Sequence, residues 1–300
     1  MTEQLLERQR GVTTGGGNQH IAARGLDSGV PTIVIAPGGS GSMNLAELWR
    51  YRELVYFLAA RDVKVKYKQT ALGAAWVLIQ PVLAMAVFTL FLGSLAGLPS
   101  DGIPYPLFAY LGLLPWTYFS NATTNASTSL VTNTALVARV YFPRLAIPIA
   151  AVLSGLLDFA IGFGLLLVLL IVFQVGLRPS LLLVPLLMAL TMANALAVSL
   201  WLSALDVRYR DVRAAIPFAI QVWMFATPVV YPASLVPAAY RPLYGLNPMA
   251  SVVDTFRWAV VGRGEPSAAM LAISAAVVLI TLLTGLLYFR RVERSFADVI

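Results

Sequence analysis

The fold is decided by long apolar stretches such as residues 146–174, AIPIAAVLSGLLDFAIGFGLLLVLLIVFQ, in which Asp158 is the single charged side chain. A helix needs roughly 20 predominantly apolar residues to cross the hydrocarbon core of a bilayer. Five further stretches contain no Asp, Glu, Lys, Arg or His, namely 69–100, 102–138, 179–205, 214–240 and 266–289. The pattern predicts an all-α integral membrane protein with six transmembrane helices, at about 70–95, 106–134, 146–174, 181–205, 214–232 and 267–289.

The composition agrees with a membrane protein and excludes several other classes. Of the 300 residues, 59% are hydrophobic and 12% are charged, whereas soluble domains carry about 25% charged residues. The net charge of +7 could suggest a nucleic-acid partner, but Lys and Arg lie in short segments beside the apolar stretches. We therefore expect binding to a membrane and no nucleic acid. The chain has no cysteine, which excludes disulfides and thiolate metal sites.

The basic residues also predict the orientation in the membrane. If the amino terminus lies inside, the inner segments after residue 43 hold 14 Lys and Arg residues, the outer segments hold 4, and the tail at 1–43 holds the remaining 3. Short cytoplasmic loops carry an excess of Lys and Arg in membrane proteins. Both termini are therefore predicted to be cytoplasmic.

Two segments precede the first span. Residues 1–43 are rich in Gly, Ser, Thr and Pro, so we expect a flexible cytoplasmic tail ahead of a membrane domain at 44–300. The run GGSGS at 38–42 lacks the Lys-Ser/Thr of a phosphate loop, which favours a linker.

Residues 44–68 are predicted to form an amphipathic helix at the membrane surface. At about 100° per residue, one sector collects Arg50, Glu53, Arg61, Lys64 and Lys68, and the opposite sector collects Leu45, Leu48, Val55, Tyr56, Ala59 and Val63. A basic face with Trp and Tyr suits the headgroup layer. A soluble amphipathic helix is the alternative.

The segment 233–265 is too apolar for a plain loop and too interrupted for a span. Asn247 can cap a helix that has Pro248 at its first position, and an apolar stripe follows at Met249, Val252, Val253, Phe256 and Val260. A helix of about three turns cannot cross about 30 Å of hydrocarbon. We therefore predict a short re-entrant helical pair on the outer side, bordering a pathway.

Residues for catalysis are scarce. His20 is the one histidine, and the outer acids Asp101, Asp254 and Glu265 are widely spaced. The sequence contains no Ser/His/Asp set, metal-ligand cluster or dinucleotide glycine pattern. We therefore predict a transport protein and not an enzyme, with no cofactor and no metal site of its own.

Asp158 lies about midway along its span. Acids inside a membrane are costly and usually face the bundle interior or a water-filled cavity. Asp158 is therefore expected either to line a substrate path or to pair with an Arg from a neighbouring helix or subunit. A purely structural alternative is a protonated Asp bonded to Ser or Thr.

The chain is also rich in aromatic residues, most of which suit interfacial anchoring or packing. A sugar path is the alternative, because ring faces contact the C–H surfaces of sugars without strong hydrogen bonds. Trp76, Trp223 and Phe225, expected at helix mid-depth, are the candidates for that role.

Several motifs resemble one family. They are LWRYRELVYFLAARDVKVKYKQTALGAAWVLIQP (48–81), RVYFPRLAIPIA (139–150), TPVVYP (227–232), LNPM (246–249) and ERSFADVI (293–300). In this order they resemble the membrane permeases of ATP-binding-cassette exporters for O-antigen, capsule and teichoic acid. The resemblance covers about residues 44–300.

The resemblance implies a homodimer in the bacterial inner membrane, coupled to two copies of a separate ATPase that binds ATP and Mg. The surface helix and the first inner loop would receive the ATPase, through Arg61, Lys64, Arg139, Tyr141, Phe142 and Arg144. Positive-inside charge alone is the alternative explanation of the arginines. The outer gate would include Tyr231, Asn247, Pro248 and Arg257.

The resemblance further implies that the cargo is a lipid-linked glycan, which would pass between the two subunits. Two rivals stay open: a similar permease for drugs or lipids, and a stand-alone secondary transporter or membrane enzyme that needs no ATPase.

Overall fold

The computed structural model describes residues 49–68, 75–139, 142–209, 211–237, 240–264 and 266–293, all within one compact unit, Asn44–Ile300. These residues form helices and turns, with no β-strand among them, so the all-α prediction is confirmed there. The predicted tail at 1–43 lies outside the described residues. The helices are α2 (Arg52–Lys68), α3 (Ala75–Phe88), η2 (Thr89–Leu95), α4 (Tyr105–Thr132), α5 (Thr134–Arg139), α6 (Ala146–Ser154), α7 (Leu156–Val172), η3 (Pro179–Leu183), α8 (Val184–Arg208), α9 (Val212–Phe225), η4 (Ala233–Leu235), α10 (Arg241–Gly245), α11 (Pro248–Val261) and α12 (Ala268–Glu293).

Among the described residues, four helical segments are long and apolar enough to cross a membrane: Ala75–Leu95, Ala146–Val172, Pro179–Arg208 and Ala268–Glu293. Each coincides with a predicted span. Helix α4 has 28 residues without an acidic or basic side chain. It is nevertheless not among these four segments, because its many hydroxyl and amide groups lower its mean hydropathy. Its burial explains this difference, because side chains inside a bundle need not be apolar enough to face lipid.

The fifth predicted span, 214–232, is too long at its carboxyl end. Helix α9 ends at Phe225, and residues 226–232 form a non-helical turn. Pro228 and Pro232 explain the end of the helix, because proline lacks the N–H and disfavours helical backbone in the residue before it. With 14 residues, α9 is about 21 Å long, which is less than the thickness of the hydrocarbon core.

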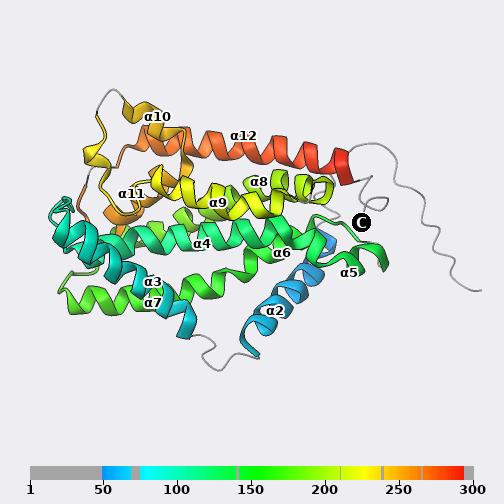
Figure 1. The fold of residues 1–300 in the computed structure, drawn as a ribbon, viewed down its shortest axis with the longest axis horizontal. Coiled ribbons are helices and arrows are strands. Elements are labelled where there is room, and N and C mark those ends of the chain that lie inside the picture. Colours follow the sequence, from blue (N-terminus) through cyan, green and yellow to red (C-terminus); the bar gives the residue numbers. More distant parts are fainter. Residues whose placement is uncertain are drawn as a thin grey trace, which may run out of the picture. The chain divides into compact units, whose positions relative to one another are not determined.

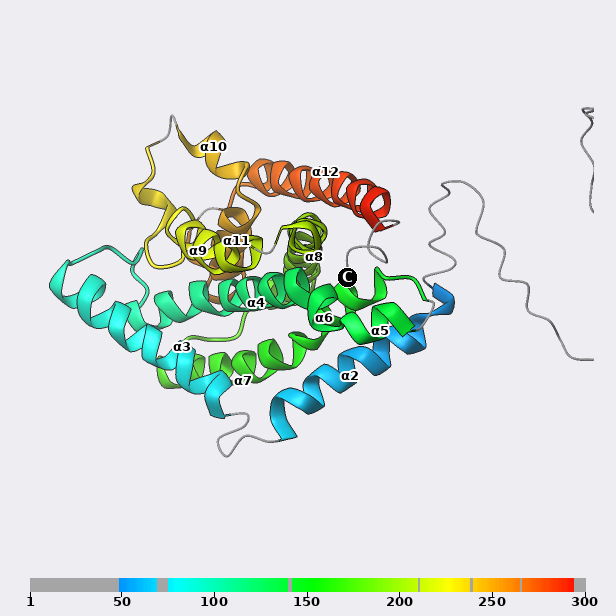
Figure 2. The same ribbon diagram turned by 45° about the vertical axis from the view of Figure 1, so that its right-hand side comes forward.

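Helix α4 is the centre of the bundle. It packs most extensively on α8 and also contacts α3, α6, α7, α9 and α11. Figure 1 and Figure 2 both show α4 between α8 and α7, with α12 on the far side of α8. The half of α4 that begins at Tyr105 is the better enclosed, since every residue from Leu107 to Trp116 is buried.

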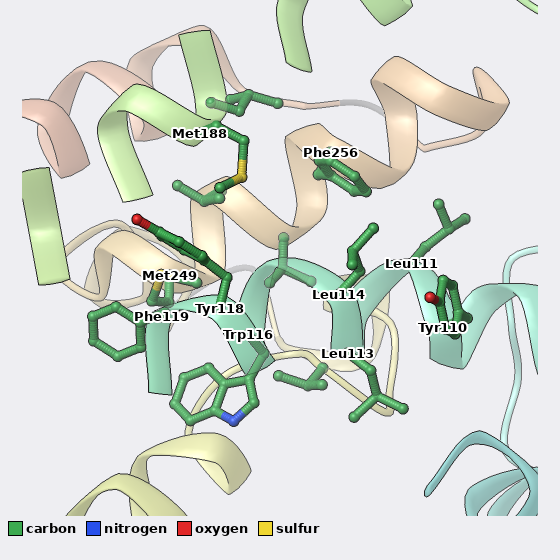
Figure 3. Packing of buried hydrophobic residues seen from close by; sticks show 14 of the residues in the cluster. Tyr110, Leu111, Leu113, Leu114, Trp116, Tyr118, Phe119, Met188, Met249 and Phe256 are labelled. Carbon is green, nitrogen blue, oxygen red and sulfur yellow. The ribbon is translucent and has the colours of Figure 1, made fainter. Parts of the chain in front are cut away.

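The largest apolar core surrounds that enclosed half. Figure 3 shows Leu111, Leu114 and Phe119 of α4 beside Met188 of α8 and Met249 and Phe256 of α11. Phe119 and Phe256 are fully buried, and burying one such side chain stabilises a fold by about 1.5–3 kcal/mol in water. Helix α11 therefore lies inside the bundle, as its predicted apolar stripe requires.

The third predicted span is interrupted between α6 and α7 at Gly155. The hydroxyl of Tyr118 donates to the carbonyl oxygen of Val152 at 3.0 Å. A Cβ atom on Gly155 would lie 3.2 Å from the Tyr118 ring. Contact with α4 therefore explains why the helix is interrupted at a glycine, and it places Asp158 in the first turn of α7.

Helix α2 packs mainly on α6. Its buried side chains are Val55 and Leu58, which belong to a second apolar cluster with residues of α4, α6, α8 and α12. Val55 was expected on the apolar face. Tyr56, also assigned to that face, is 70% exposed, because the contact with α6 involves a narrower sector than predicted.

Candidate functional site

The turn at residues 226–232, which contains TPVVYP, is held by side chains from distant parts of the chain. Arg257 of α11 donates to the carbonyl oxygen of Pro228 at 2.6 Å and also to that of Val229. The hydroxyl of Tyr105 donates to the carbonyl oxygen of Val230 at 2.7 Å. Three consecutive carbonyl groups are therefore bound, and the 226–232 turn is fixed against α4 and α11.

Arg257 is a buried arginine, only 2% exposed. Its guanidinium also lies over the ring of Phe108, 3.8 Å from the ring centre, where the negative face of the ring attracts a cation. Gly112 of α4 lies at the same place. A Cβ atom there would be 2.2 Å from the Val229 carbonyl oxygen and 2.5 Å from the Arg257 guanidinium, so the close contact requires glycine.

Asn247 joins α11 to the end of α9. Its side-chain oxygen accepts from the backbone N–H of Met249 at 3.2 Å and from the indole N–H of Trp223 at 3.0 Å. Its amide nitrogen donates to Thr227 Oγ1 at 2.9 Å and to the carbonyl of Ala226 at 3.2 Å. The predicted helix start at Asn247 and Pro248 is confirmed.

The remaining predicted outer residues lie around the same turn. The hydroxyl of Tyr231 donates to the carbonyl oxygen of Phe225 at 2.9 Å and forms a hydrogen bond with the hydroxyl of Tyr244. Trp223 and Phe225 lie in the last turn of α9, so the prediction that they lie at helix mid-depth is wrong, because α9 ends earlier than expected. Trp223 packs edge-on against Phe119 of α4, and Phe225 is exposed.

The other half of α4 carries a polar stripe, which consists of Thr117, Asn121, Thr124, Asn125, Thr128 and Thr132. These residues are exposed or half-buried, whereas Ala122 and Ala126 on the opposite face are buried. The hydroxyls of Thr124, Thr128 and Thr132 donate to backbone carbonyls one turn earlier. Asn121 and Asn125 make no side-chain hydrogen bond with a described residue, so the stripe offers amide groups outward.

A cavity of about 220 Å³ lies at the middle of α4, between α2, α3, α4 and α7. Two residues of the polar stripe, Thr117 and Asn121, line it. Trp76 and Asp158, both predicted for the substrate path, also line this cavity. Trp223 and Phe225 do not, so the four predicted path residues fall into two separate groups.

Asp158 has partners that were not predicted. Its carboxylate pairs with Lys66 and accepts a hydrogen bond from the hydroxyl of Tyr67, both on α2. The charged partner is thus Lys66 of α2 and not an arginine, and the hydroxyl partner is Tyr67 and not a serine or threonine. Burial, and then the bond to Asp158, raise the pKa of Tyr67 above its ordinary value, which keeps the phenol protonated as a donor.

The predicted coupling residues lie in different environments. Arg61 donates to Asp62 and to Asn133 Oδ1 at 2.8 Å, and Lys64 is exposed. Phe142 is buried in the second apolar cluster. Arg144 donates to the backbone carbonyl of Glu293 at the end of α12. The side chain of Arg139 and all of Tyr141 lie outside the described residues.

Lys66, Tyr67, Gly112 and Asn121 are functional candidates that the sequence did not single out. The polar stripe does have a signal, since Thr117, Asn121, Asn125 and Thr128 recur at helical spacing in a charge-free stretch. The Lys66–Asp158 pair has none, because the residues are 92 positions apart. Within the described part of the chain, no cluster of His, Asp or Glu is suited to hold a metal ion.

Comparison with known proteins places the chain among transporters. The family model described as "ABC-2 type transporter" matches residues 53–261. The O-antigen export system permease protein RfbA of Myxococcus xanthus is 29% identical over 257 residues, covering 85% of this chain and 98% of the relative. RfbA of Klebsiella pneumoniae is 26% identical over 253 residues, covering 83% and 95%. The polysialic acid transport protein KpsM of Escherichia coli is 22% identical over 239 residues, covering 79% and 93%.

The family model covers more than half of the chain, and the match includes α4, the Asp158 pair and the residues that hold the 226–232 turn. The chain belongs to the ABC-2 type transporter family.

Proposed function

We propose that this chain is the membrane subunit of an exporter that moves lipid-linked polysaccharide across the bacterial inner membrane. A separate ATPase supplies the energy. The names of the relatives support the cargo class, since they are permeases for O-antigen and a transporter of polysialic acid. The chain itself contributes the path and takes no chemical part in ATP hydrolysis.

The polar stripe of α4 is the observation that carries this proposal. An apolar environment gives no partner to an exposed amide, and an unpaired amide costs several kcal/mol in hydrocarbon. Asn121 and Asn125 therefore face water or a polar cargo and not lipid. Uncharged hydroxyl and amide groups form hydrogen bonds of modest strength, which a sugar chain can exchange one after another as it moves.

The stripe extends over 16 residues from Thr117 to Thr132, or about 24 Å of helix at 1.5 Å per residue. It occupies only one half of α4. The other half is enclosed by α11 and by the 226–232 turn. A path that is polar at one end and packed at the other corresponds to a transporter closed on one side.

The orientation follows from the basic residues, with both termini in the cytoplasm and the polar half of α4 on the cytoplasmic side. On this arrangement the 226–232 turn and α11 close the outer side. We propose six membrane spans, with α4 and α9 as the second and fifth. Helix α4 is less apolar than the four clear spans, which agrees with a place beside the path, and α9 is apolar but shorter than those spans. Helices α10 and α11 are then the re-entrant pair.

We further propose a homodimer with two ATPase subunits. The open face of α4 needs a second wall, and a second copy of the chain supplies it. ATP-driven closure of the ATPases would displace α2 and the segment 135–144, and so open the seam between the two permeases. The exposed Arg61 and Lys64 then belong to the coupling surface, while Phe142 and Arg144 stiffen it from within.

Cysteine labelling tests the path directly, because the chain has no cysteine of its own. Single cysteines at Thr117, Asn121, Asn125 and Thr128 should react with a membrane-impermeant methanethiosulfonate in inside-out vesicles. Cysteines at Ala122 and Ala126, on the buried face, should not react. Cysteines at Val168 and Ile171 of α7, which are exposed but apolar, distinguish lipid contact from water contact.

The labelling pattern decides the role of the stripe. If the stripe positions reacted as slowly as Val168 and Ile171, α4 would face lipid and the path would lie elsewhere. Deletion of the gene in its own host tests the cargo: surface polysaccharide should disappear and lipid-linked glycan should accumulate inside. Intact surface polysaccharide combined with new drug sensitivity would instead support the rival drug permease.

A further inference from the structure

The cavity between α2, α3, α4 and α7 has two kinds of wall. Aromatic rings from three helices line it, namely Trp76, Tyr118 and Phe159. Tyr118 and Phe159 are fixed in an edge-to-face contact, and the Tyr118 hydroxyl is already bound to Val152. The aromatic side of the cavity is therefore preformed.

The other wall is polar and has no internal partners. Gln80, Thr117 and Asn121 line the cavity, and their side chains make no hydrogen bond with any residue that the structure describes. Their position within membrane helices makes this costly unless water or a ligand completes the bonds. The amides each offer donors and an acceptor, and the hydroxyl offers both.

The charges at the cavity cancel each other. Lys66 and Asp158 line it together and form an ion pair, so neither a free cation nor a free anion is favoured as the occupant. Both groups still have unused hydrogen-bonding capacity, because an ammonium has three donors and a carboxylate about four acceptor positions. The site therefore suits an uncharged ligand that is rich in hydroxyl groups.

The shape of the site narrows the ligand further. Its volume of about 220 Å³ lies below the range of about 300–1,000 Å³ that drug-sized ligands occupy. A pyranose ring has C–H groups on its faces and hydroxyls around its edge. The negative faces of aromatic rings attract such C–H groups, and the amides, Lys66 and Asp158 can bind the hydroxyls.

We propose that this cavity binds a single sugar ring of the exported glycan. This inference rests on the proposed function and names one place within the path, where the polar stripe meets α2 and α7. Lys66 makes α2 part of the site, so the surface helix contacts the occupant. The 226–232 turn and its residues take no part in the site.

Protection from labelling tests the site with simple probes. Thr117→Cys and Asn121→Cys are made separately in the purified full chain in lipid nanodiscs. The probes are methyl glycosides of glucose, galactose, mannose, rhamnose and N-acetylglucosamine. A binding glycoside at twice its Kd should slow labelling about threefold, because only the empty fraction reacts.

Matched controls separate binding from general effects. Asn125→Cys lies one turn further along the same stripe and outside the cavity lining, so its labelling should not slow. Sorbitol, an open-chain polyol, should protect neither position. Trp76→Ala in the Thr117→Cys background should abolish protection by the glycoside. Trp49→Ala changes an exposed tryptophan just before α2 and should leave that protection unchanged.

The possible results are distinct. Protection at positions 117 and 121 alone, lost with Trp76→Ala, supports the site. Equal protection at 125, protection by sorbitol, or no protection by any of the glycosides would overturn it. If the stripe cysteines react but no glycoside protects them, the sugar site is contradicted and the proposed path still stands. If the stripe cysteines do not react, the proposed path itself is contradicted. Elution from gel filtration as a single peak at the same volume as the wild type confirms that each variant is folded.

Discussion

Gly112 of α4 lies against the 226–232 turn and has no room for a larger side chain. A methyl group there would meet a backbone carbonyl and a buried guanidinium, at 2.2 Å and 2.5 Å. We predict that Gly112→Ala destabilises the protein by about 1–3 kcal/mol, as overpacking does. Gly164→Ala is the control, since Gly164 of α7 has no neighbour within 4 Å of an added Cβ. Thermal unfolding in one detergent should show a loss for the first variant and no loss for the second.

A second prediction concerns Arg257, which holds the same turn. Lysine keeps the positive charge but lacks the planar fork that binds two carbonyls at once. Losing one charge-assisted hydrogen bond costs about 1.5–3 kcal/mol, so Arg257→Lys should lower the unfolding temperature and speed hydrogen exchange at residues 229–231. Arg263→Lys, at an exposed arginine bound to the Gly102 carbonyl, should change neither. Equal effects of the two changes would contradict a special role for Arg257.

Individual residues differ in how much their sequence context reveals. The capping role of Asn247 could be predicted, because an Asn-Pro pair before an apolar stripe is a local signal. The partners of Asp158 could not, since the sequence shows the cost of a buried acid but not which base lies beside it. Gly112 was equally hidden: its need for glycine comes from a turn more than a hundred residues away, and its own helix gives no sign of it.

Among the helices, the sequence predicted the positions of the clear spans better than it predicted where helices end or break. Hydropathy located the helices that face outward, since each of the four clear membrane segments matches a predicted span. It did not place the end of α9 or the break at Gly155. Those features depend on Pro228 and on the Tyr118 contact, and a periodicity of apolar residues contains no information on either.

Helix α11 depends on its N-cap residue, Asn247. Asn247→Ala removes an N-cap, which costs about 0.5–2 kcal/mol, and leaves the indole N–H of Trp223 without its acceptor. We predict lower thermal stability and faster hydrogen exchange in the first turn of α11, at residues 249–251. Asn125→Ala, at an exposed asparagine of α4, is the matched control for stability. Unchanged exchange in Asn247→Ala would show that α11 is held by its apolar face alone.

In the molecule as a whole, exposed basic side chains and the enclosed Arg257 lie in different regions. Basic side chains lie on α2 and at the ends of α8 and α12, whereas Arg257 is enclosed beside the 226–232 turn. Charge at one end can meet a partner in water, while the enclosed arginine can only hold its own chain together. We therefore propose different tasks for the two ends, coupling to the ATPase at one and closure of the path at the other.

This difference gives a test of the coupling surface in the complete transporter. Arg144 is bound to Glu293, so reversing its charge would also disturb α12. Lys64 is exposed and makes no hydrogen bond or ion pair with a described residue, which makes Lys64→Glu combined with Arg139→Glu the cleaner change. We predict that the double variant still forms the dimer but loses about tenfold in affinity for the ATPase, equivalent to 1.4 kcal/mol. Export should fall with it.

The affinity is measured with the purified ATPase and the permease in nanodiscs, over a range of salt concentrations. Attraction between exposed charges weakens as salt shortens the Debye length, so wild-type binding should weaken with salt and the binding of the double variant should depend on it less. Arg178→Glu with Arg263→Glu, at the opposite end, is the control that should leave ATPase binding unchanged. If the control weakened binding as much as Lys64→Glu with Arg139→Glu, the ATPase would dock at the other end and the proposed orientation would be reversed.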